Sequence, residues 1–153
     1  MQDEVFSYES PLGCITYAWN GESCRGLWLQ GGPDRGLCGD NPVSEWLKVY
    51  FSGEACPLPP MAEARTTFQG LMRAALLEIP RGQTRTYGEL AKLLHTAPRA
   101  MGQALGANPL PLLIPCHRIV AANGLGGFAC GLEWKRRLLA FEQSGSSERG
   151  GLF

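Results

Sequence analysis

The sequence predicts an α+β fold in which a small antiparallel β-sheet lobe with one helix precedes a mainly helical lobe. Segments rich in β-branched and aromatic residues lie within the first 30 residues. Apolar residues at helical spacing follow from residue 42 onward, and a stretch with three prolines at 55–64 separates the two parts. With 153 residues, 44% of them hydrophobic, the chain can form one domain or two small lobes around a packed core.

The first lobe begins with strand-like segments at residues 5–10, 12–19 and 26–30. Proline, glycine and asparagine bound these segments, as expected in a short antiparallel sheet. A helix should begin at Asn41-Pro42, because proline is favoured at the first helical position, and should end at Gly53. Its apolar residues recur at i, i+3, i+4, i+7 and i+8, namely Val43, Trp46, Leu47, Tyr50 and Phe51.

The second lobe is predicted to be helical. Thr67 can cap a helix whose apolar face comprises Phe68, Leu71, Met72, Ala75, Leu76 and Ile79. Thr86 and Glu89 have the spacing of a capping box, in which each side chain satisfies the other's free backbone N–H. The box opens a helix at 87–95 that should bury Leu90, Leu93 and Leu94. A second short helix at 98–107 follows a tight turn, which makes the pair a helix-turn-helix.

A last helix, at 133–143, places Leu138 and Leu139 on its core side. Residues 144–153 are rich in serine and glycine, which predicts a disordered tail. We therefore divide the chain into a lobe at 1–60, a second domain at 61–143 and the tail. The acidic N-terminus lacks a basic-then-apolar leader, and no apolar run reaches the length of a membrane span, so we expect a cytoplasmic protein.

Charge divides unevenly between the two halves. The whole chain has a formal net charge of zero, but residues 1–64 carry −6 and residues 65–153 carry +6. A neutral total argues against a protein that binds DNA over its entire surface. The basic second half is nevertheless suited to contacts with phosphates.

Cys116 and His117 stand side by side in an otherwise apolar segment that runs from Leu112 to Val120. A thiol beside an imidazole is a candidate nucleophile with its base, inside a buried strand or turn. The base matters because an ordinary cysteine, with a pKa of about 8.5, is mostly protonated at neutral pH. The alternative is a structural cysteine in the core, since free cysteine is among the residues most often buried.

The six cysteines form no CxxC pair and match no familiar zinc spacing. The chain has only two histidines, and one of them adjoins Cys116. We therefore expect no metal site, and in a reducing compartment most of these thiols should be structural.

The residues around Cys116 carry a family resemblance. They comprise Asn108-Pro109, Pro115-Cys116-His117-Arg118, Gly126-Gly127-Phe128, Arg85-Thr86-Tyr87-Gly88-Glu89-Leu90-Ala91, Arg99-Ala100-Met101-Gly102 and Glu142. From about residue 68 to residue 143 the chain resembles the O6-alkylguanine-DNA alkyltransferase family, the methylated-DNA–protein-cysteine methyltransferases. The resemblance implies a ribonuclease-H-like first lobe and a winged-helix-like helix-turn-helix in the second.

The resemblance implies DNA repair by direct reversal. An O6-alkylated guanine, or an O4-alkylated thymine, is flipped out of double-stranded DNA, and its alkyl group passes irreversibly to Cys116. His117 corresponds to the base, which acts through a water, and Glu142 to the carboxylate that orients it. Tyr87 corresponds to the hydrogen-bond donor for the leaving base, and Asn108 to the residue that ties the helix-turn-helix to the active-site segment. The reaction needs no cofactor, each molecule acts once, and we expect a monomer.

The same resemblance assigns the DNA contacts and the pocket. Arg99 corresponds to the arginine finger that fills the space left by the flipped base. The helix at 98–107 would enter the minor groove, where its glycines permit close approach of the main chain. The further DNA-contacting residues would be Tyr87, Ala100, Gly102 and Leu105. The pocket for the alkyl group would be lined by Pro115, Phe128, Ala129 and Gly131.

Three features depart from the family pattern or fall short of it. Gly106 stands where relatives carry an arginine, so a DNA contact is missing there. Cys130 has no assigned role, although it could narrow the pocket. Some relatives hold a structural zinc near the N-terminus, but Cys14 and Cys24 are too few ligands to predict one.

Three other functions stay open at this level. A cysteine hydrolase could use Cys116 and His117, although no oxyanion hole is evident. A relative that only binds alkylated bases would lack the acceptor thiol, which this chain retains. A helix-turn-helix regulator would need an effector-sensing part, and the sequence shows none.

Overall fold

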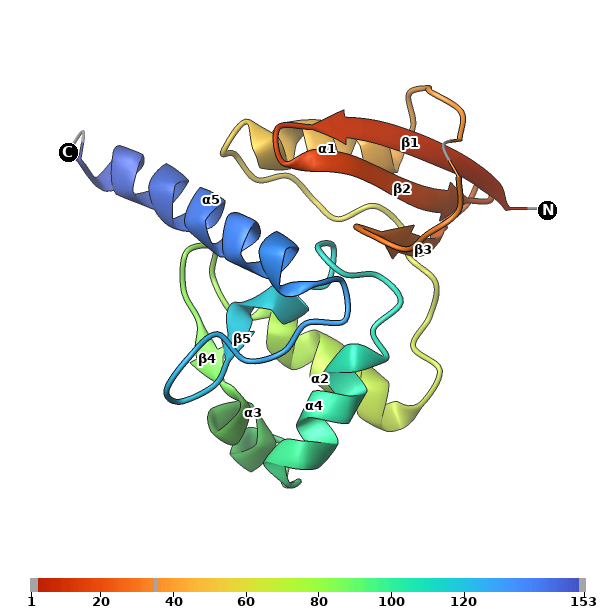
Figure 1. Cartoon of the computed structure of the whole chain (residues 1–153). Helices are drawn as coiled ribbons and strands as arrows, with labels where there is room; N and C mark the ends of the chain where they lie inside the picture. Colours follow the sequence, from red (N-terminus) through yellow and green to blue (C-terminus); the bar gives the residue numbers. More distant parts are fainter. Residues whose placement is uncertain (1–2, 35, 152–153) are drawn as a thin grey trace. The chain divides into compact units, whose positions relative to one another are not determined.

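The computed structural model describes residues 3–34 and 36–151, the last seven of them by their backbone alone. It confirms the predicted α+β class, because a three-stranded antiparallel sheet with one helix precedes a mainly helical part (Figure 1). The chain divides into two compact units, Met1–Ala62 and Glu63–Phe153. Within the described ranges, no helix is both long and apolar enough to cross a membrane.

The N-terminal unit is built on a sheet with the strand order β1-β2-β3. The strands are β1 (Glu4–Ser10), β2 (Gly13–Trp19) and β3 (Cys24–Trp28). β3 begins two residues earlier than the predicted start at 26, because the segment at 60–62 pairs with it. The Cys24 N–H donates to the Pro60 carbonyl, and the Ala62 N–H donates to the Cys24 carbonyl, both at 2.8 Å. The last part of the predicted linker therefore extends the sheet.

A single helix, α1 (Pro42–Phe51), packs against this sheet through Val43, Leu47 and Tyr50 (Figure 1). Its start follows the prediction: Asn41 is the N-cap and Pro42 is the first helical residue. The Asn41 Oδ1 accepts hydrogen bonds from the backbone N–H groups of Val43 and Ser44, at 3.0 and 2.9 Å. It also accepts the Tyr17 hydroxyl at 3.0 Å, which ties the helix start to β2.

The C-terminal unit holds α2 (Thr67–Leu77), α3 (Tyr87–Leu93), α4 (Pro98–Gly106) and α5 (Leu132–Gly151). α3 and α4 form the predicted helix-turn-helix, in which His95 adopts a φ of +55° between the helices (Figure 1). The predicted capping box is also present. The Glu89 N–H donates to the Thr86 hydroxyl oxygen at 3.1 Å, and the Thr86 N–H donates to the Glu89 carboxylate at 2.9 Å.

Three predictions about these helices were wrong. Thr66, not Thr67, caps α2, because its hydroxyl accepts from the Gln69 N–H at 3.0 Å while Thr67 is already helical. Leu71 is 54% exposed, because the buried side of α2 is set by Met72 and Leu76. Leu93 is 64% exposed, because the buried side of the short α3 is set by Leu90 and the residue after it.

α5 covers the predicted helix at 133–143 and continues to Gly151. The structure thus differs from the disordered tail predicted from residue 144, since an existing helix gains one backbone hydrogen bond for each residue that it adds. The last two residues of that predicted tail, 152–153, lie outside the described residues.

A two-residue parallel pairing positions the functional segment. β4 (Arg85–Thr86) pairs with β5 (Ile119–Val120), which directly follows the 3₁₀ turn η1 (Cys116–Arg118). The start of α3 therefore lies beside the turn that carries Cys116. The chain leading into this turn is almost fully buried, including Leu110, Leu112, Leu113 and Ile114.

Substitution of Gly36 tests how the edge of the sheet beside β1 is closed in the N-terminal unit. The Gly36 N–H donates to the Ser7 hydroxyl at 2.7 Å, and an added Cβ would lie 2.1 Å from the Val5 carbonyl oxygen. Gly36→Ala should displace this segment and lower the free energy of unfolding by about 1–3 kcal/mol through lost backbone hydrogen bonds. Urea unfolding followed by circular dichroism measures the change.

The matched control is Gly39→Ala, whose Cβ would make an ordinary 3.5 Å contact with the Phe6 ring. It should leave stability within about 0.5 kcal/mol of the wild type. Equal stabilities for the two variants would show that Gly36 is not needed for close approach to β1.

Candidate active site

The side chains of neighbouring residues in the turn η1 point in different directions. Successive residues of a 3₁₀ turn are rotated by about 120°, so Cys116 and His117 do not point the same way. Cys116, 6% exposed, lines a pocket of about 550 Å³. His117 is fully buried and contacts Glu142 of α5. The turn thus presents the thiol to the pocket while its neighbour is held in the interior.

The Glu142 carboxylate is shared by two neighbours from η1. Its Oε2 lies 2.8 Å from the His117 Nε2 and accepts from the Arg118 Nη2 at 2.9 Å, and its Oε1 accepts from the Arg118 Nε at 3.0 Å. Arg118 also donates to the Ile79 carbonyl at 2.8 Å, just after the end of α2. This set is a buried ionic cluster that joins α5 to the turn.

Burial and the charges in this cluster determine the protonation state of His117. Burial by itself raises the pKa of the Glu142 carboxyl, but hydrogen bonds and charge from His117 and Arg118 outweigh it and hold that pKa well below its ordinary value. Burial lowers the pKa of His117, the hydrogen bond and charge of Glu142 raise it, and the charges on Arg118 and Lys135 lower it again, so that the pKa lies below its ordinary value. His117 is therefore neutral at pH 7. Because an ionised carboxylate only accepts, Nε2 carries the hydrogen and Nδ1 keeps a lone pair.

Cys116 is held by Asn108, which follows α4. The Asn108 Nδ2 donates to the Cys116 Sγ at 3.2 Å and to the Ile114 carbonyl at 3.1 Å, and its Oδ1 accepts from the Leu110 N–H at 3.0 Å. The expected tie between the helix-turn-helix and the active-site segment is therefore present in the geometry. Burial raises the pKa of the Cys116 thiol to about 12, although the Asn108 hydrogen bond lowers it. The thiol is protonated at neutral pH.

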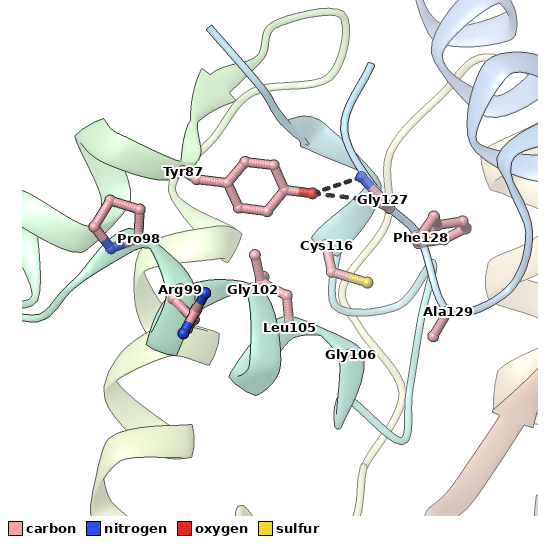
Figure 2. A pocket seen from close by; sticks show the side chains of 10 residues that line it. All are labelled: Tyr87, Pro98, Arg99, Gly102, Leu105, Gly106, Cys116, Gly127, Phe128 and Ala129. Atoms are coloured by element: carbon pink, nitrogen blue, oxygen red, sulfur yellow. Dashed lines mark hydrogen bonds between the residues drawn. The ribbon is translucent and has the colours of Figure 1, made fainter. Parts of the chain in front are cut away.

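The pocket lies between α4 and the loop before α5 (Figure 2). Among the residues expected from the sequence, it is lined by Tyr87, Arg99, Gly102, Leu105, Cys116, Phe128 and Ala129. Pro98, Gly106 and Gly127 line it as well. Its volume suits a ligand of the size of a nucleobase.

The remaining expected residues lie around the pocket and do not line it. Pro115 is buried directly before Cys116, and Ala100 is half-buried on α4. Gly131, with a φ of +98°, ends the loop at the start of α5. His117 and Glu142 are buried, and Asn108 reaches the site through its bond to the Cys116 sulfur.

Tyr87 fixes the pocket loop, as Figure 2 shows. Its hydroxyl accepts from the Gly127 N–H at 3.1 Å and donates to the Gly127 carbonyl at 3.2 Å. Gly126 makes this contact possible, because it has a φ of +76° and an added Cβ would lie 2.7 Å from the Tyr87 ring. The loop is thus closed onto the first residue of α3.

Lys135 is a site residue whose place the sequence reasoning missed. It is 1% exposed, donates from Nζ to the Gly127 carbonyl at 2.8 Å and lies 5.6 Å from the centre of the Tyr87 ring. Burial lowers its pKa to about 8, although a negative charge on Cys116 raises it. The signal was helical spacing: Lys135 precedes the buried Leu138 and Glu142 by three and seven residues on α5.

Comparisons with known proteins agree with this geometry. The model of the 6-O-methylguanine DNA methyltransferase DNA-binding domain matches residues 67–144. A methylated-DNA–protein-cysteine methyltransferase of Methanosarcina acetivorans is 39% identical over 150 residues, covering 90% of this chain and 96% of the relative. One from Saccharolobus islandicus is 37% identical over 139 residues, covering 88% and 92%. The chain belongs to the O6-methylguanine DNA methyltransferase family.

Solved structures of the same family match more than nine-tenths of the chain. The O6-methylguanine methyltransferase of Mycobacterium tuberculosis matches with a TM-score of 0.80 and 32% identity over 94% of each chain. The OGT protein of that organism in complex with DNA matches with a TM-score of 0.77 and 33% identity, over 92% of this chain and 93% of that one. The chain is thus a methylated-DNA–protein-cysteine methyltransferase, and the hydrolase and the regulator that the sequence left open have no support.

The described part of the chain shows no candidate metal site. Among residues 3–34 and 36–144, whose side chains the structure describes, no three His, Cys, Asp or Glu side chains are grouped so that they could hold an ion.

Glu142 should make stability depend on pH. Because its pKa in the folded state lies below the ordinary 4.5, it contributes stability above about pH 4.5 that is lost as the pH falls toward the folded value. Glu142→Gln removes this contribution and leaves His117 and Arg118 without their anion. Its free energy of unfolding at pH 7 should drop by about 3 kcal/mol. Urea unfolding from pH 7 to pH 3 measures both effects.

The matched control is Glu133→Gln on the same helix, where Glu133 is 61% exposed and pairs with Arg136 and Arg137. Exposed pairs contribute only about 0–1 kcal/mol, so this variant should keep the acid dependence of the wild type. An acid slope in Glu142→Gln as steep as that of the wild type would contradict the assignment.

Proposed function

We propose that the protein repairs O6-alkylguanine in double-stranded DNA by moving the alkyl group irreversibly onto the sulfur of Cys116. The observation that carries this proposal is the position of Cys116 at the wall of a base-sized pocket, with the His117–Glu142 pair buried beside it. A thiol bonded by Asn108 and adjacent to an oriented base has the parts that a nucleophile needs. O4-alkylthymine presents the same alkyl–oxygen bond and is proposed as a second substrate.

The transfer is a displacement at a saturated carbon. The Cys116 proton passes to the His117 Nδ1 through a water, and the resulting thiolate attacks the alkyl carbon. The bond between that carbon and the guanine O6 breaks, and its electron pair stays with the guanine. To meet the charge that develops on the base, the Tyr87 hydroxyl would redirect its hydrogen from the Gly127 carbonyl to the leaving base.

His117 is suited to this step because its protonation state is set by Glu142. Nε2 donates to the carboxylate, and Nδ1 is buried with no hydrogen-bond partner among the described residues. The imidazolium that forms would be stabilised by the adjacent carboxylate. Burial raises the resting pKa of Cys116 to about 12, so the transfer needs a base that takes up the thiol proton.

Lys135 and Asn108 favour the thiolate. Asn108 donates to the sulfur, and the charge on Lys135 lowers the pKa of Cys116. Lys135 also holds the Gly127 carbonyl, so it supports the loop against which the base would rest. Nothing in this set can hydrolyse a thioether, and each molecule therefore acts once. That it acts as a monomer is a separate part of the proposal.

DNA would be bound by the helix-turn-helix, with α4 in the minor groove. Arg99, at the second position of α4, is exposed and lines the pocket, as an arginine that replaces the flipped base must be. A Cβ added at Gly102 or Gly106 would meet nothing within 4 Å, so this face leaves room for the DNA backbone. The net charge of +6 on residues 65–153 supports contacts with phosphates.

Cys116→Ser tests the acceptor. The variant should take up no label from a duplex that carries O6-methylguanine with a radioactive methyl group, because a serine hydroxyl is a poor nucleophile at neutral pH. Its binding to the same duplex should be kept. The wild type should take up one equivalent, which mass spectrometry locates on the tryptic peptide of residues 100–118.

Cys38→Ser is the control, since Cys38 is an exposed thiol of the N-terminal unit. It should transfer as the wild type does. Label on Cys116→Ser, or more than one equivalent on the wild type, would contradict a single-use acceptor at Cys116.

Arg99→Ala tests base flipping. Its rate with duplex DNA should fall by about 10-fold or more, because only the duplex requires a base to be extruded and replaced. Its rate with free O6-benzylguanine should change little. Arg136→Ala removes the same charge from α5, where Arg136 is 64% exposed and pairs with Glu133, and should affect neither rate. Equal losses on both substrates would show that Arg99 supports the pocket and not extrusion.

A further inference from the structure

A second thiol, Cys130, lies directly after two residues of the pocket wall and takes no part in the proposed transfer. Neither Cys116 nor Cys130 is in a disulfide, and Cys130 is the more exposed of the two. Phe128 and Ala129, directly before Cys130, line the same pocket as Cys116. Figure 2 shows the Cys116 sulfur on the side of the pocket where these two residues lie.

Cys130 occupies a turn that can move without disturbing a helix. The Gly131 N–H donates to the Phe128 carbonyl at 3.0 Å, which closes a four-residue turn with Cys130 at its third position. Gly126 and Gly131, with φ values of +76° and +98°, flank the segment, and α5 begins only at Leu132. A turn flanked by two glycines has the backbone freedom that a disulfide, with its Cα separation of about 4.4–6.8 Å, would use.

The two sulfurs are also close enough for their charges to interact. Burial is the main reason that the pKa of Cys116 is raised to about 12, and a negative charge on Cys130 raises it further. Thiols that interact in this way, on two segments that line one pocket, are candidates for oxidation to a pair.

We propose that Cys116 and Cys130 form a reversible disulfide, with hydrogen peroxide as the oxidant, that withholds the alkyl acceptor. Formation of the bond requires no DNA. Its consequence for activity rests on the proposed function, in which Cys116 is the acceptor.

The chemistry balances with one peroxide for two thiols. The thiolate of the more accessible Cys130 attacks a peroxide oxygen, the O–O bond breaks, and hydroxide leaves to take up a proton as water. The Cys116 sulfur then attacks the sulfenic sulfur of Cys130. The S–O bond breaks, and the departing hydroxide leaves as a second water with the Cys116 proton. The two thiols lose two electrons, and a dithiol returns them by exchange.

This disulfide would protect the acceptor as well as block it. A sulfur already in a disulfide cannot advance to the sulfinic or sulfonic acid, which are irreversible. For a protein that uses each acceptor once, loss to overoxidation would be equivalent to loss of the molecule. The link would also draw the turn across the pocket and so exclude the alkylated base.

Peptide mapping tests the bond directly, because trypsin cuts at Arg118 between the two cysteines. Cys116 falls in the peptide of residues 100–118 and Cys130 in that of residues 119–135. After treatment of the full chain with hydrogen peroxide and blocking of remaining thiols, a non-reducing digest should contain these two peptides joined. Dithiothreitol should separate them. Cys130→Ser should give no joined pair, whereas Cys38→Ser should give it as the wild type does.

Alkyl transfer from an O6-methylguanine duplex measures the effect of the disulfide on activity. Peroxide should lower transfer by the wild type about 10-fold or more, and dithiothreitol should restore it. The same recovery is expected for Cys38→Ser and should be absent for Cys130→Ser. Wild-type protein methylated beforehand should no longer form the joined pair.

Two results would overturn the proposal. One is a digest of the peroxide-treated wild type that lacks the joined peptides. The other is a peroxide-induced loss of alkyl transfer in Cys130→Ser that dithiothreitol reverses as fully as in the wild type. Failure of the proposed function is seen separately. In that case the reduced wild type takes up no label on Cys116, while the peptide map still shows whether the disulfide forms.

Discussion

The fold and the chemistry of the C-terminal unit both depend on one buried carboxylate. Glu142 is fully buried, yet it remains ionised because His117 and Arg118 surround it with three short contacts of 2.8–3.0 Å. Arg118 carries the connection to the Ile79 carbonyl after α2. Removing one partner of such a cluster leaves an uncompensated charge in the interior, which costs several kcal/mol. The residue that is proposed to orient the base therefore also fastens α5 to the turn that bears the proposed nucleophile.

Around this cluster, the site separates the groups that prepare the thiol from those that meet the substrate. Asn108 and the His117–Glu142 pair act on Cys116 from the protein side. Tyr87, with the loop that it binds at Gly127, forms the substrate side. Burial raises the pKa of the Cys116 thiol to about 12, and the Asn108 hydrogen bond and the charge on Lys135 act against that increase. The proposed disulfide with Cys130 would protect the same sulfur from irreversible oxidation.

Local rules predicted those features that depend on neighbours in sequence. Asn41 and the pair of Thr86 and Glu89 cap their helices as expected, since the groups that they satisfy lie within three residues. The predictions failed where an apolar residue had a choice of faces. Leu71 and Leu93 fit a helical apolar pattern but are more than half exposed, because packing against other elements decides which side of a short helix is buried.

The sequence by itself determined the class of the fold and the helix-turn-helix, because local periodicity and capping residues depend on near neighbours along the chain, and through the family resemblance it singled out Cys116, His117 and Glu142 as candidates. Only the tertiary structure decided that Arg118 shares the Glu142 carboxylate, that Lys135 is buried beneath the pocket loop, and that Asn108 donates to the Cys116 sulfur. These contacts join distant segments or depend on the direction of a side chain. Burial and pairing then set the charges of the site, and both are properties of the folded chain and not of any short stretch of sequence.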